Sequence, residues 1–365
     1  MFTIVPVEYY SFVWHNLLLL LVMVFLLQTK NYSLSDASNL KVKNSFGIGL
    51  LLFCLILFGF RPISGKYFAD MRTYANVFET YQQGDPFRAD KDVTFEFFTK
   101  LCSEIMTLDM FFFTCFFLYI FPMYRIAKKF FNDYWAYAFF MLVGSYSFWS
   151  YGVNGIRNGI ATSLFLWGFS MTKKQYGAAL IVLSFFVHKS LMIPAAAYFI
   201  TLFYKNPKSY LYFWLATIPL SLLLGGFWER FFLSLGFGED DRFQSYLSLE
   251  EEAQQITTSF RWAFLLYSAT GVYAGWFFIF KKKFVDPVYT QLFNIYLFAN
   301  GFWVLVIRAN FSNRFAYLSW FLLSLVIIYP LLKVQFYKNQ HVIVVRILAI
   351  YFLFTYFMNF ILTRL

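Results

Sequence analysis

Residues 176–204 read YGAALIVLSFFVHKSLMIPAAAYFITLFY, and the length of this run decides how often the chain crosses a membrane. A membrane-spanning helix needs roughly 20 apolar residues. The run is therefore too long for one ordinary span and too short for two. We predict a hairpin of two short arms, 176–187 and 190–204, with its tip at His188, Lys189 and Ser190.

Ten further apolar runs are distributed along the chain. Hydrophobic residues make up 60% of the 365 residues and charged residues only 13%, whereas soluble domains carry about 25% charged residues. The sequence therefore predicts an all-α polytopic membrane protein, a single integral membrane domain over residues 1–365 with about 12 membrane segments. The ten other runs are 6–27, 44–60, 107–124, 134–153, 157–172, 209–226, 262–280, 288–307, 315–332 and 342–362.

Lysines and arginines fall into different loops of this scheme. One set of loops carries most of the lysines, as the positive-inside rule expects of short cytoplasmic loops, and this places the N-terminus and the C-terminus outside. A single tilted helix over 176–204 would instead place Lys281 to Lys283 outside, which favours the hairpin. The predicted cytoplasmic basic residues are Lys30, Lys41, Lys43, Lys128, Lys129, Lys173, Lys174, Lys205, Lys208, Lys281, Lys282, Lys283, Lys333, Lys338, Arg125 and Arg346.

The predicted outer face carries ten arginines, which the positive-inside rule does not explain. A guanidinium fork binds phosphate oxygens bidentately, so this face is a candidate surface for a phosphate-bearing ligand. The ten residues are Arg61, Arg72, Arg88, Arg157, Arg230, Arg242, Arg261, Arg308, Arg314 and Arg364.

The short arms of the hairpin imply a cavity. Arms of about 12 and 15 residues reach only roughly 18 to 22 Å at 1.5 Å per residue, so the tip at His188 lies below the outer surface. Arg157 begins another short run and is sunk in the same way. Charge at membrane depth is tolerated where protein or a water-filled cavity surrounds it, which predicts a cavity that opens outward.

Two outer loops, about 61–107 and 227–261, are long enough to fold. In the first, aromatic and apolar residues recur at helical spacing up to Gly84, and a second helix begins at Asp92. Both helices look amphipathic and are expected to lie on the membrane surface. The second loop contains Asp240-Asp241, which we interpret as a solvated turn rather than a metal site.

Arg157 and the His188-Lys189 pair are the strongest candidates for a functional site, although each has a structural alternative. Arg157 could extend to the interface beside a close-packing pair, Gly155 and Gly159. A lone histidine is more often hydrogen-bonded to a backbone carbonyl than catalytic. The functional interpretation is that these residues bind a diphosphate or transfer a proton.

Further candidates lie at helix ends and in the first outer loop. Arg308 and Arg314 flank a short turn and either anchor the interface or converge on one anion. Asp70 and Tyr74 are four residues apart and share a helical face. Glu96 belongs to an i, i+4 series with Lys100 and Glu104, whose structural interpretation is mutual pairing.

No Walker A, GxGxxG or HExxH motif occurs in the sequence. We therefore expect no cofactor, no metal ion and no nucleic-acid partner.

The order of these short motifs resembles the EpsG family of Wzy-like exopolysaccharide polymerases. The resemblance covers about residues 60–320, with Ala69 where the family usually has glycine, and Phe97 and Phe98 where it usually has small residues. The segments that carry it are Ala69-Asp70-Met71-Arg72-Thr73-Tyr74, Phe95-Glu96-Phe97-Phe98, Ile156-Arg157-Asn158-Gly159-Ile160-Ala161, Phe186-Val187-His188-Lys189-Ser190 and Asn313-Arg314-Phe315-Ala316-Tyr317.

This resemblance implies a metal-independent membrane glycosyltransferase with a GT-C-like fold in the bacterial cytoplasmic membrane, facing the periplasm or exterior. Polyprenyl-diphosphate-linked glycans, such as undecaprenyl diphosphate carriers, would be donor and acceptor in exopolysaccharide, capsule or O-antigen synthesis. A flippase and a chain-length regulator are expected partners, besides the bilayer. The implied catalytic residues are Asp70, Glu96 and His188, the diphosphate ligands Arg157, Lys189, Arg308 and Arg314, and the sugar-binding or outer-loop residues Tyr74, Arg242, Tyr246 and Tyr317.

Three alternatives remain open. A lipid-linked oligosaccharide flippase would share the cationic cavity, but transporters often show internal repeats, and none stands out here. A membrane O-acyltransferase would draw its donor from the cytoplasm, whereas the ionisable residues cluster outside. An O-antigen ligase uses the same residue types as a polymerase.

Overall fold

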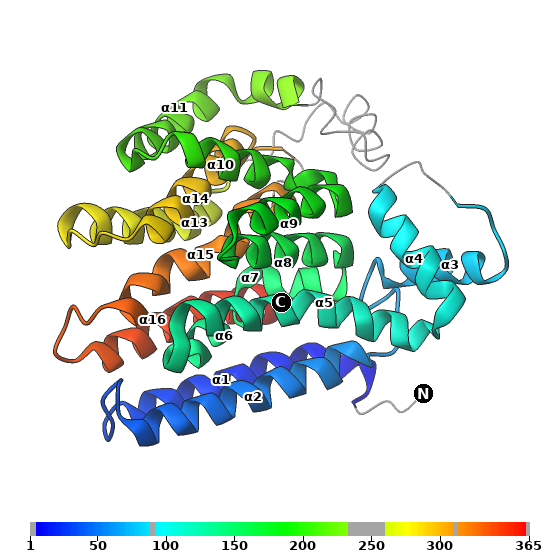
Figure 1. The fold of residues 1–365 in the computed structure, drawn as a ribbon, viewed down its shortest axis with the longest axis horizontal. Coiled ribbons are helices and arrows are strands. Elements are labelled where there is room, and N and C mark those ends of the chain that lie inside the picture. Colours follow the sequence, from blue (N-terminus) through cyan, green and yellow to red (C-terminus); the bar gives the residue numbers. More distant parts are fainter. Residues whose placement is uncertain (1–4, 88–91, 233–259, 310–312, 363–365) are drawn as a thin grey trace. The chain divides into compact units, whose positions relative to one another are not determined.

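The computed structural model of the chain describes residues 5–87, 92–232, 260–309 and 313–362, and all regular elements within these ranges are helical (Figure 1). Seven helices in the described part are long and apolar enough to cross a membrane. These findings confirm an all-α polytopic membrane protein; the number of 12 segments and their orientation stay predictions. The seven candidate spans are Val7–Gln28, Ala37–Gly59, Leu108–Val143, Pro207–Trp228, Trp262–Lys281, Phe315–Lys333 and Gln340–Ile361.

The chain divides into two compact units, residues 1–191 with 328–365, and residues 192–327. In the first unit, α5 packs against α2 and α8, α8 packs against α9, and α1 packs against α16. Its helices are α1 (Tyr10–Gln28), α2 (Ala37–Gly59), α3 (Met71–Gln82), α4 (Val93–Ile105), α5 (Leu108–Phe131), α6 (Trp135–Val143), α7 (Tyr146–Val153), α8 (Ile156–Ser170), α9 (Lys174–Val187) and α16 (Gln340–Tyr356).

Aromatic rings hold the centre of the first unit together. Trp14 of α1 lies 5.0 Å from Phe58 of α2 and 5.3 Å from Phe148 of α7, measured between ring centroids. Phe58 also stacks on Phe116 of α5 at 5.1 Å. All four side chains are buried. Aromatic pairs at these distances add to the energy of area burial, so some of the many phenylalanines of the chain serve to pack four helices on one another.

Helices α8 and α9 approach each other closely because glycines face each other across the contact. A Cβ added to Gly177 would lie 2.6 Å from the carbonyl oxygen of Gly168, and one added to Gly168 would lie 2.7 Å from the carbonyl oxygen of Gly177. Small residues allow membrane helices to pack backbone to backbone. The two helices that carry the strongest candidate residues are thereby held in a close pair.

The run 176–204 is broken where we predicted. Helix α9 ends at Val187, His188 has an extended backbone (φ −152°, ψ 120°), and the short 3-10 helix η3 (Lys189–Leu191) precedes α10 (Met192–Phe203). The fold-back of α10 on α9 stays a prediction.

Other boundaries differ from the sequence prediction. The run 134–153 is two short helices, α6 and α7, because Gly144 lowers helix propensity by about 1 kcal/mol and Ser145 is extended (φ −70°, ψ 151°).

Helix α2 begins at Ala37, seven residues before the predicted run. Lys43, expected in a loop, is therefore helical and buried, with its ammonium group donating to Gln28 Oε1 and lying 4.1 Å from the Phe25 ring centroid.

Residues 61–107, predicted to form the first outer loop, contain the two predicted helices. Helix α3 buries Met71, Ala75, Phe78 and Tyr81 and is followed by Gly84 at φ 95°, a conformation that favours glycine. Helix α4 begins directly after Asp92. It also exposes an apolar stripe at i, i+4 spacing, with exposed fractions between 45 and 68%; the stripe consists of Val93, Phe97, Leu101 and Ile105. Most of the second predicted loop, residues 233–259, lies outside the described residues.

In the second unit, α14 packs against α10, α11 and α13. Its centre is polar: Asn300 accepts a hydrogen bond from Trp214 Nε1 at 2.7 Å and donates to the hydroxyls of Ser268 and Ser319 at 3.1 and 2.9 Å. Such interhelical hydrogen bonds stabilise membrane helix bundles. The helices of this unit are α10, α11 (Pro207–Phe232), α13 (Trp262–Trp276) with the π-helix η5 (Phe277–Lys281), α14 (Pro287–Leu305) and α15 (Asn313–Lys333), which continues into the first unit.

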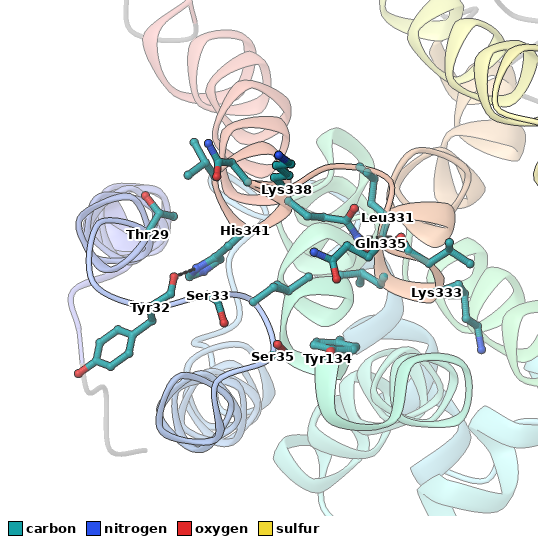
Figure 2. Close-up of a pocket in the computed structure, with 16 residues that line it drawn as sticks. Thr29, Tyr32, Ser33, Ser35, Tyr134, Leu331, Lys333, Gln335, Lys338 and His341 are labelled. Carbon is teal, nitrogen blue, oxygen red and sulfur yellow. Dashed lines mark hydrogen bonds between the residues drawn. The ribbon is translucent and has the colours of Figure 1, made fainter.

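The first unit also contains a pocket of about 210 Å³, whose lining includes Lys333 and Lys338 (Figure 2). It is lined by the turn between α1 and α2 and by the connection between α15 and α16. His341 there contacts the Tyr32 carbonyl oxygen with Nδ1 at 2.7 Å and the Tyr137 hydroxyl with Nε2 at 3.0 Å. A carbonyl oxygen only accepts, so Nδ1 donates and neutral His341 accepts from Tyr137. Both ring nitrogens are thus engaged in joining helices, which assigns this histidine a structural role.

Candidate active site

Asp92 occupies an unusual position at the start of α4. An aspartate before a helix normally accepts a hydrogen bond from a backbone N–H of the first turn, but the Asp92 carboxylate makes no such bond. Its backbone is left-handed (φ 41°, ψ 53°), a conformation that is uncommon for residues other than glycine. The local structure therefore directs this carboxylate away from its own helix.

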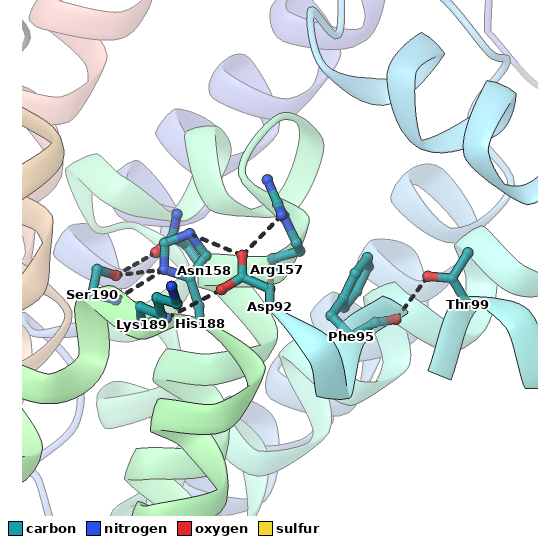
Figure 3. A network of polar contacts seen from close by, with 8 residues as sticks. All are labelled: Asp92, Phe95, Thr99, Arg157, Asn158, His188, Lys189 and Ser190. Atoms are coloured by element: carbon teal, nitrogen blue, oxygen red, sulfur yellow. Dashed lines mark hydrogen bonds and ion pairs between the residues drawn. The ribbon is translucent and has the colours of Figure 1, made fainter. Parts of the chain in front are cut away.

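The Asp92 carboxylate instead contacts two other helices (Figure 3). Arg157 Nη1, at the start of α8, donates to Oδ2 at 2.8 Å. The backbone N–H of Lys189, directly after α9, donates to Oδ1 at 3.3 Å. His188 Nε2 lies 3.8 Å from Oδ2. One carboxylate thus joins the two residues that the sequence singled out, Arg157 and His188.

The other side of the His188 ring is held by a hydrogen-bonded chain. Nδ1 lies 2.7 Å from Ser190 Oγ, and the Ser190 hydroxyl donates to Asn158 Oδ1 at 2.9 Å. The backbone N–H of Ser190 donates to Nδ1 at 3.2 Å. A backbone N–H only donates, so Nδ1 is an acceptor and the proton of the neutral ring lies on Nε2, the nitrogen beside Asp92.

Tyr74 completes the surroundings of Arg157. The guanidinium carbon of Arg157 lies 5.7 Å from the centroid of the Tyr74 ring, within the range of a cation–π contact. Burial raises the pKa of Tyr74 above its ordinary value of 10.0, and the positive charge of Arg157 opposes this shift. The Tyr74 hydroxyl is therefore neutral at physiological pH.

The cluster is partly shielded from solvent. The side chain of Asp92 is 9% exposed and those of Arg157 and His188 are 26% and 17% exposed. Arg157 lies in the first turn of α8, where the helix dipole favours anions and disfavours cations. The Asp92 carboxylate offsets the positive end of the helix dipole and the positive charge of Arg157. Asp92 itself is thus the anion at the start of α8.

The two carboxylates proposed from the sequence lie in the same unit, and the charge of Asp70 is close enough to the Tyr74 hydroxyl to contribute to its raised pKa. Asp70 directly precedes α3, and its backbone carbonyl oxygen accepts from the Tyr74 N–H at 3.2 Å. Glu96 accepts a hydrogen bond from the Tyr81 hydroxyl at 2.9 Å, which connects α4 to α3. Within the described contacts, the carboxylate that meets Arg157 is Asp92.

The remaining proposed residues belong to the second unit or lie outside the described residues. Arg308 donates from Nη2 to the Leu222 carbonyl oxygen at 3.5 Å and lies 6.0 Å from the Phe260 ring centroid. Arg314 is at the start of α15, and the buried Tyr317 packs on Trp320 at 5.6 Å. Arg242 and Tyr246, with Asp240 and Asp241, lie in the part of the chain that is not described.

In the sequence, Asp92 is marked only as the start of a helix. An aspartate before an amphipathic helix is most simply interpreted as an N-cap, and its sequence neighbours give no sign of contacts 65 and 97 residues away. Among the residues that the structure describes, no group of three or more His, Cys, Asp or Glu side chains is arranged to hold a metal ion. The site as described consists of a carboxylate, an arginine, a histidine and their hydrogen-bond partners.

Comparison with known proteins places this arrangement in a family. No curated protein and no solved structure matches the chain. The family model described as "EpsG family" matches residues 46–364, a range that includes α3, α4, α8 and α9 with all the residues of the cluster. The match extends over most of the sequence, and the chain therefore belongs to the EpsG family.

Proposed function

We propose that the protein is a polysaccharide polymerase that joins polyprenyl-diphosphate-linked oligosaccharide repeat units. The reaction would take place at the outer face of a bacterial cytoplasmic membrane, in exopolysaccharide, capsule or O-antigen synthesis. The observation that carries the proposal is the convergence of Arg157 and His188, from the adjacent helices α8 and α9, on one carboxylate. Membership of the EpsG family supports it.

The depth of the cluster fits a lipid-linked substrate. Helices α8 and α9 have 15 and 14 residues, which correspond to about 21 to 23 Å. The hydrocarbon core of a bilayer is about 30 Å thick. Side chains at the ends of such short helices lie within reach of a diphosphate whose polyprenyl chain is in the membrane.

The chemistry requires a ligand for the diphosphate and a base. The acceptor hydroxyl oxygen attacks the anomeric carbon of the donor, the bond from that carbon to the diphosphate oxygen breaks, and the diphosphate leaves on its polyprenyl chain. Arg157 would bind the leaving phosphate, where charge develops, and the His188 imidazole would accept the hydroxyl proton. Asp70 and Glu96 are alternative bases in this proposal.

Other residues complete the proposed site. Lys189 would also bind the diphosphate, and Tyr74 would contact the glycan. Arg308 and Arg314 as diphosphate ligands, and Tyr317, Arg242 and Tyr246 as glycan contacts, stay predictions from the sequence. We propose no metal ion or cofactor in the reaction. A flippase and a chain-length regulator would supply repeat units and limit the product. The proposed orientation has both termini and the cluster outside.

The test is deletion of the gene followed by analysis of lipid-linked glycans in the two leaflets. Single repeat units that reach the outer leaflet but do not lengthen support a polymerase. Units that remain on the cytoplasmic side contradict it and favour a flippase. Finished glycan that accumulates on its polyprenyl carrier also contradicts it and favours a ligase.

A second experiment uses the purified full chain in proteoliposomes with lipid-linked repeat units. The wild-type protein is expected to form oligomers of the repeat unit, and His188→Gln should abolish this activity while leaving expression and thermal stability close to wild type. A His188→Gln protein that polymerises at the wild-type rate would remove His188 from the proposed mechanism. His341→Gln removes a histidine with a structural role, so its activity and thermal stability show how far instability alone lowers polymerisation.

A further inference from the structure

Two aspartates of this chain precede helices and behave differently. Asp286 precedes α14 and accepts a hydrogen bond from the backbone N–H of Tyr289 at 2.9 Å, as an N-cap does. Asp92 precedes α4, adopts a left-handed backbone and makes no capping bond. Its carboxylate extends to α8 and to the end of α9 instead. A strained residue that gives up its local hydrogen bond points to a function at its distant contacts.

We infer that Asp92 is a positioning residue for His188: it orients the imidazole and stabilises the positive charge that appears when the ring takes up a proton. The catalytic consequence of this inference rests on the proposed function. The proton would come from the acceptor hydroxyl as its oxygen bonds to the anomeric carbon. Asp92 itself forms and breaks no bond in this step.

The geometry supports both parts of this role. Oδ1 accepts from the Lys189 N–H, the amide directly after His188, and so fixes the backbone that carries the ring. Oδ2 lies 3.8 Å from Nε2. Because Nδ1 accepts from the Ser190 N–H, the N–H of the neutral ring is on Nε2 and faces the carboxylate, and a protonated ring places its positive charge beside the same oxygen. The carboxylate therefore holds the ring orientation and favours the protonated ring.

The charged groups around the ring come from three elements. Asp92 faces it from the start of α4, Arg157 binds the same carboxylate oxygen from α8, and Lys189 follows it in η3 with an exposed side chain. Arg157 and Lys189 are positive and oppose protonation of His188. Asp92 is the carboxylate among the described contacts of the ring, so its removal should leave the effect of the two positive charges uncompensated.

A competing interpretation is that Asp92 only holds Arg157 in place. The two interpretations predict different kinetics. If Asp92 only holds Arg157, its loss misplaces the diphosphate ligand and raises KM. If Asp92 acts through His188, its loss lowers kcat, while KM stays the same or falls because Arg157 becomes available to the diphosphate.

The first experiment is solid-state NMR of the full chain in lipid bilayers, labelled with ¹⁵N-histidine. The chain has three histidines, so the His188 signal can be assigned with the His188→Gln variant. In Asp92→Asn, the titration of the His188 signal should move to lower pH by roughly 1 unit, while His15 and His341 stay unchanged. An unchanged His188 titration in a folded Asp92→Asn protein would overturn the inference.

The second experiment measures polymerisation by purified protein in proteoliposomes. Asp92→Asn should lower kcat by about 10²-fold without raising KM, and Asp92→Glu should restore part of the lost kcat. Asp286→Asn is the matched control and should retain wild-type kinetics, because asparagine caps a helix as well as aspartate does. A raised KM with unchanged kcat in Asp92→Asn would overturn the positioning role.

The two experiments separate the failure of the inference from that of the proposed function. A wild-type protein that does not polymerise, combined with a shifted His188 titration in Asp92→Asn, overturns the proposed function and leaves the Asp92–His188 pairing intact. A wild-type protein that polymerises, combined with an unchanged His188 titration in Asp92→Asn, supports the proposed function and overturns the Asp92–His188 pairing. If Asp92→Asn does not fold, Asp92→Ser also removes the charge, and an unchanged His188 titration in a folded Asp92→Ser protein would overturn the inference.

Discussion

At the scale of single residues, the charge arrangement around Arg157 determines which substitutions are informative. Arg157→Ala would leave the shielded Asp92 carboxylate without its partner, and breaking such a pair typically costs about 3 to 5 kcal/mol of stability. Loss of activity in that variant would mix misfolding with lost binding. Arg157→Lys preserves the charge and removes the planar guanidinium group, which is able to bind two phosphate oxygens at once.

We therefore predict that Arg157→Lys folds normally and loses about 10²-fold in kcat/KM, the order expected for removing one donor to a developing anion. Polymerisation in proteoliposomes measures kcat/KM, and thermal unfolding of the same preparation measures the stability of the fold. Arg230→Lys, at an exposed position of α11, serves as the control and should retain full activity. Wild-type kcat/KM in Arg157→Lys would show that bidentate binding is unimportant here.

Tyr74 provides a second prediction at this scale. Its ring lies against the Arg157 guanidinium, and burial raises the pKa of its hydroxyl above 10.0, so the hydroxyl stays protonated between pH 6 and pH 9. Tyr74→Phe keeps the ring and should change neither the pH profile of polymerisation nor, beyond about threefold, its rate. Tyr74→Ala removes a contact worth about 0.5 to 2 kcal/mol and should lower the rate by about 10-fold. Equal activities of the Phe and Ala variants would mean that the ring does not position Arg157.

At the scale of elements, the contact between α8 and α9 determines the relative position of Arg157 and His188. We predict that Gly177→Ala lowers the stability by about 1 to 3 kcal/mol, the usual cost of overpacking, because the new Cβ would lie 2.6 Å from the carbonyl oxygen of Gly168. Thermal unfolding in detergent is the measurement. Gly49→Ala on α2 is the matched control, since a Cβ there meets no atom within 4 Å. Equal melting temperatures for both variants would show that α8 and α9 can separate at no cost.

Helix α4 joins the cluster to an exposed apolar stripe, Val93, Phe97, Leu101 and Ile105. We predict that this stripe contacts lipid. Spin labels attached at Phe97→Cys and Leu101→Cys should be accessible to oxygen, which dissolves in lipid, whereas a label at the exposed Glu104→Cys should be accessible to a water-soluble nickel chelate. The three native cysteines are buried and free, so they should not compete for the label. Nickel accessibility at Phe97 would place α4 in water.

The boundaries of the helices show which structural features local sequence patterns predict. Helical spacing predicted α3 and the start of α4, since an amphipathic period, Gly84 and Asp92 are local signals. The break between α6 and α7 was missed because every residue from 135 to 143 is apolar or aromatic, and a single Gly-Ser step interrupts an otherwise unbroken run. Hydropathy measures transfer into lipid and is insensitive to a local change of backbone direction.

At the scale of the whole molecule, orientation is the prediction with the widest consequences. The lysine and arginine distribution places both termini outside and depends on a hairpin at His188. A cysteine at Lys282, which is exposed, should react with an impermeant thiol reagent only from the cytoplasmic side of intact cells. A cysteine at Glu104 should react from outside. Reaction of both from the same side would mean that residues 176–204 form a single span.

The sequence alone determined that this protein is an all-α membrane protein and that Arg157 and His188 are unusual residues. The length of an apolar run, the spacing of apolar residues along a helix and the free-energy cost of a charge in lipid are properties of short segments. They can therefore be predicted without knowing how the segments pack. Only the tertiary structure decided that Asp92 contacts Arg157 and the Lys189 amide directly after His188, over separations of 65 and 97 residues. That contact requires α8 and α9 to pack together at Gly168 and Gly177 and α4 to begin in a left-handed turn. Long-range packing of this kind depends on the whole unit at once, and no local pattern of residues specifies it.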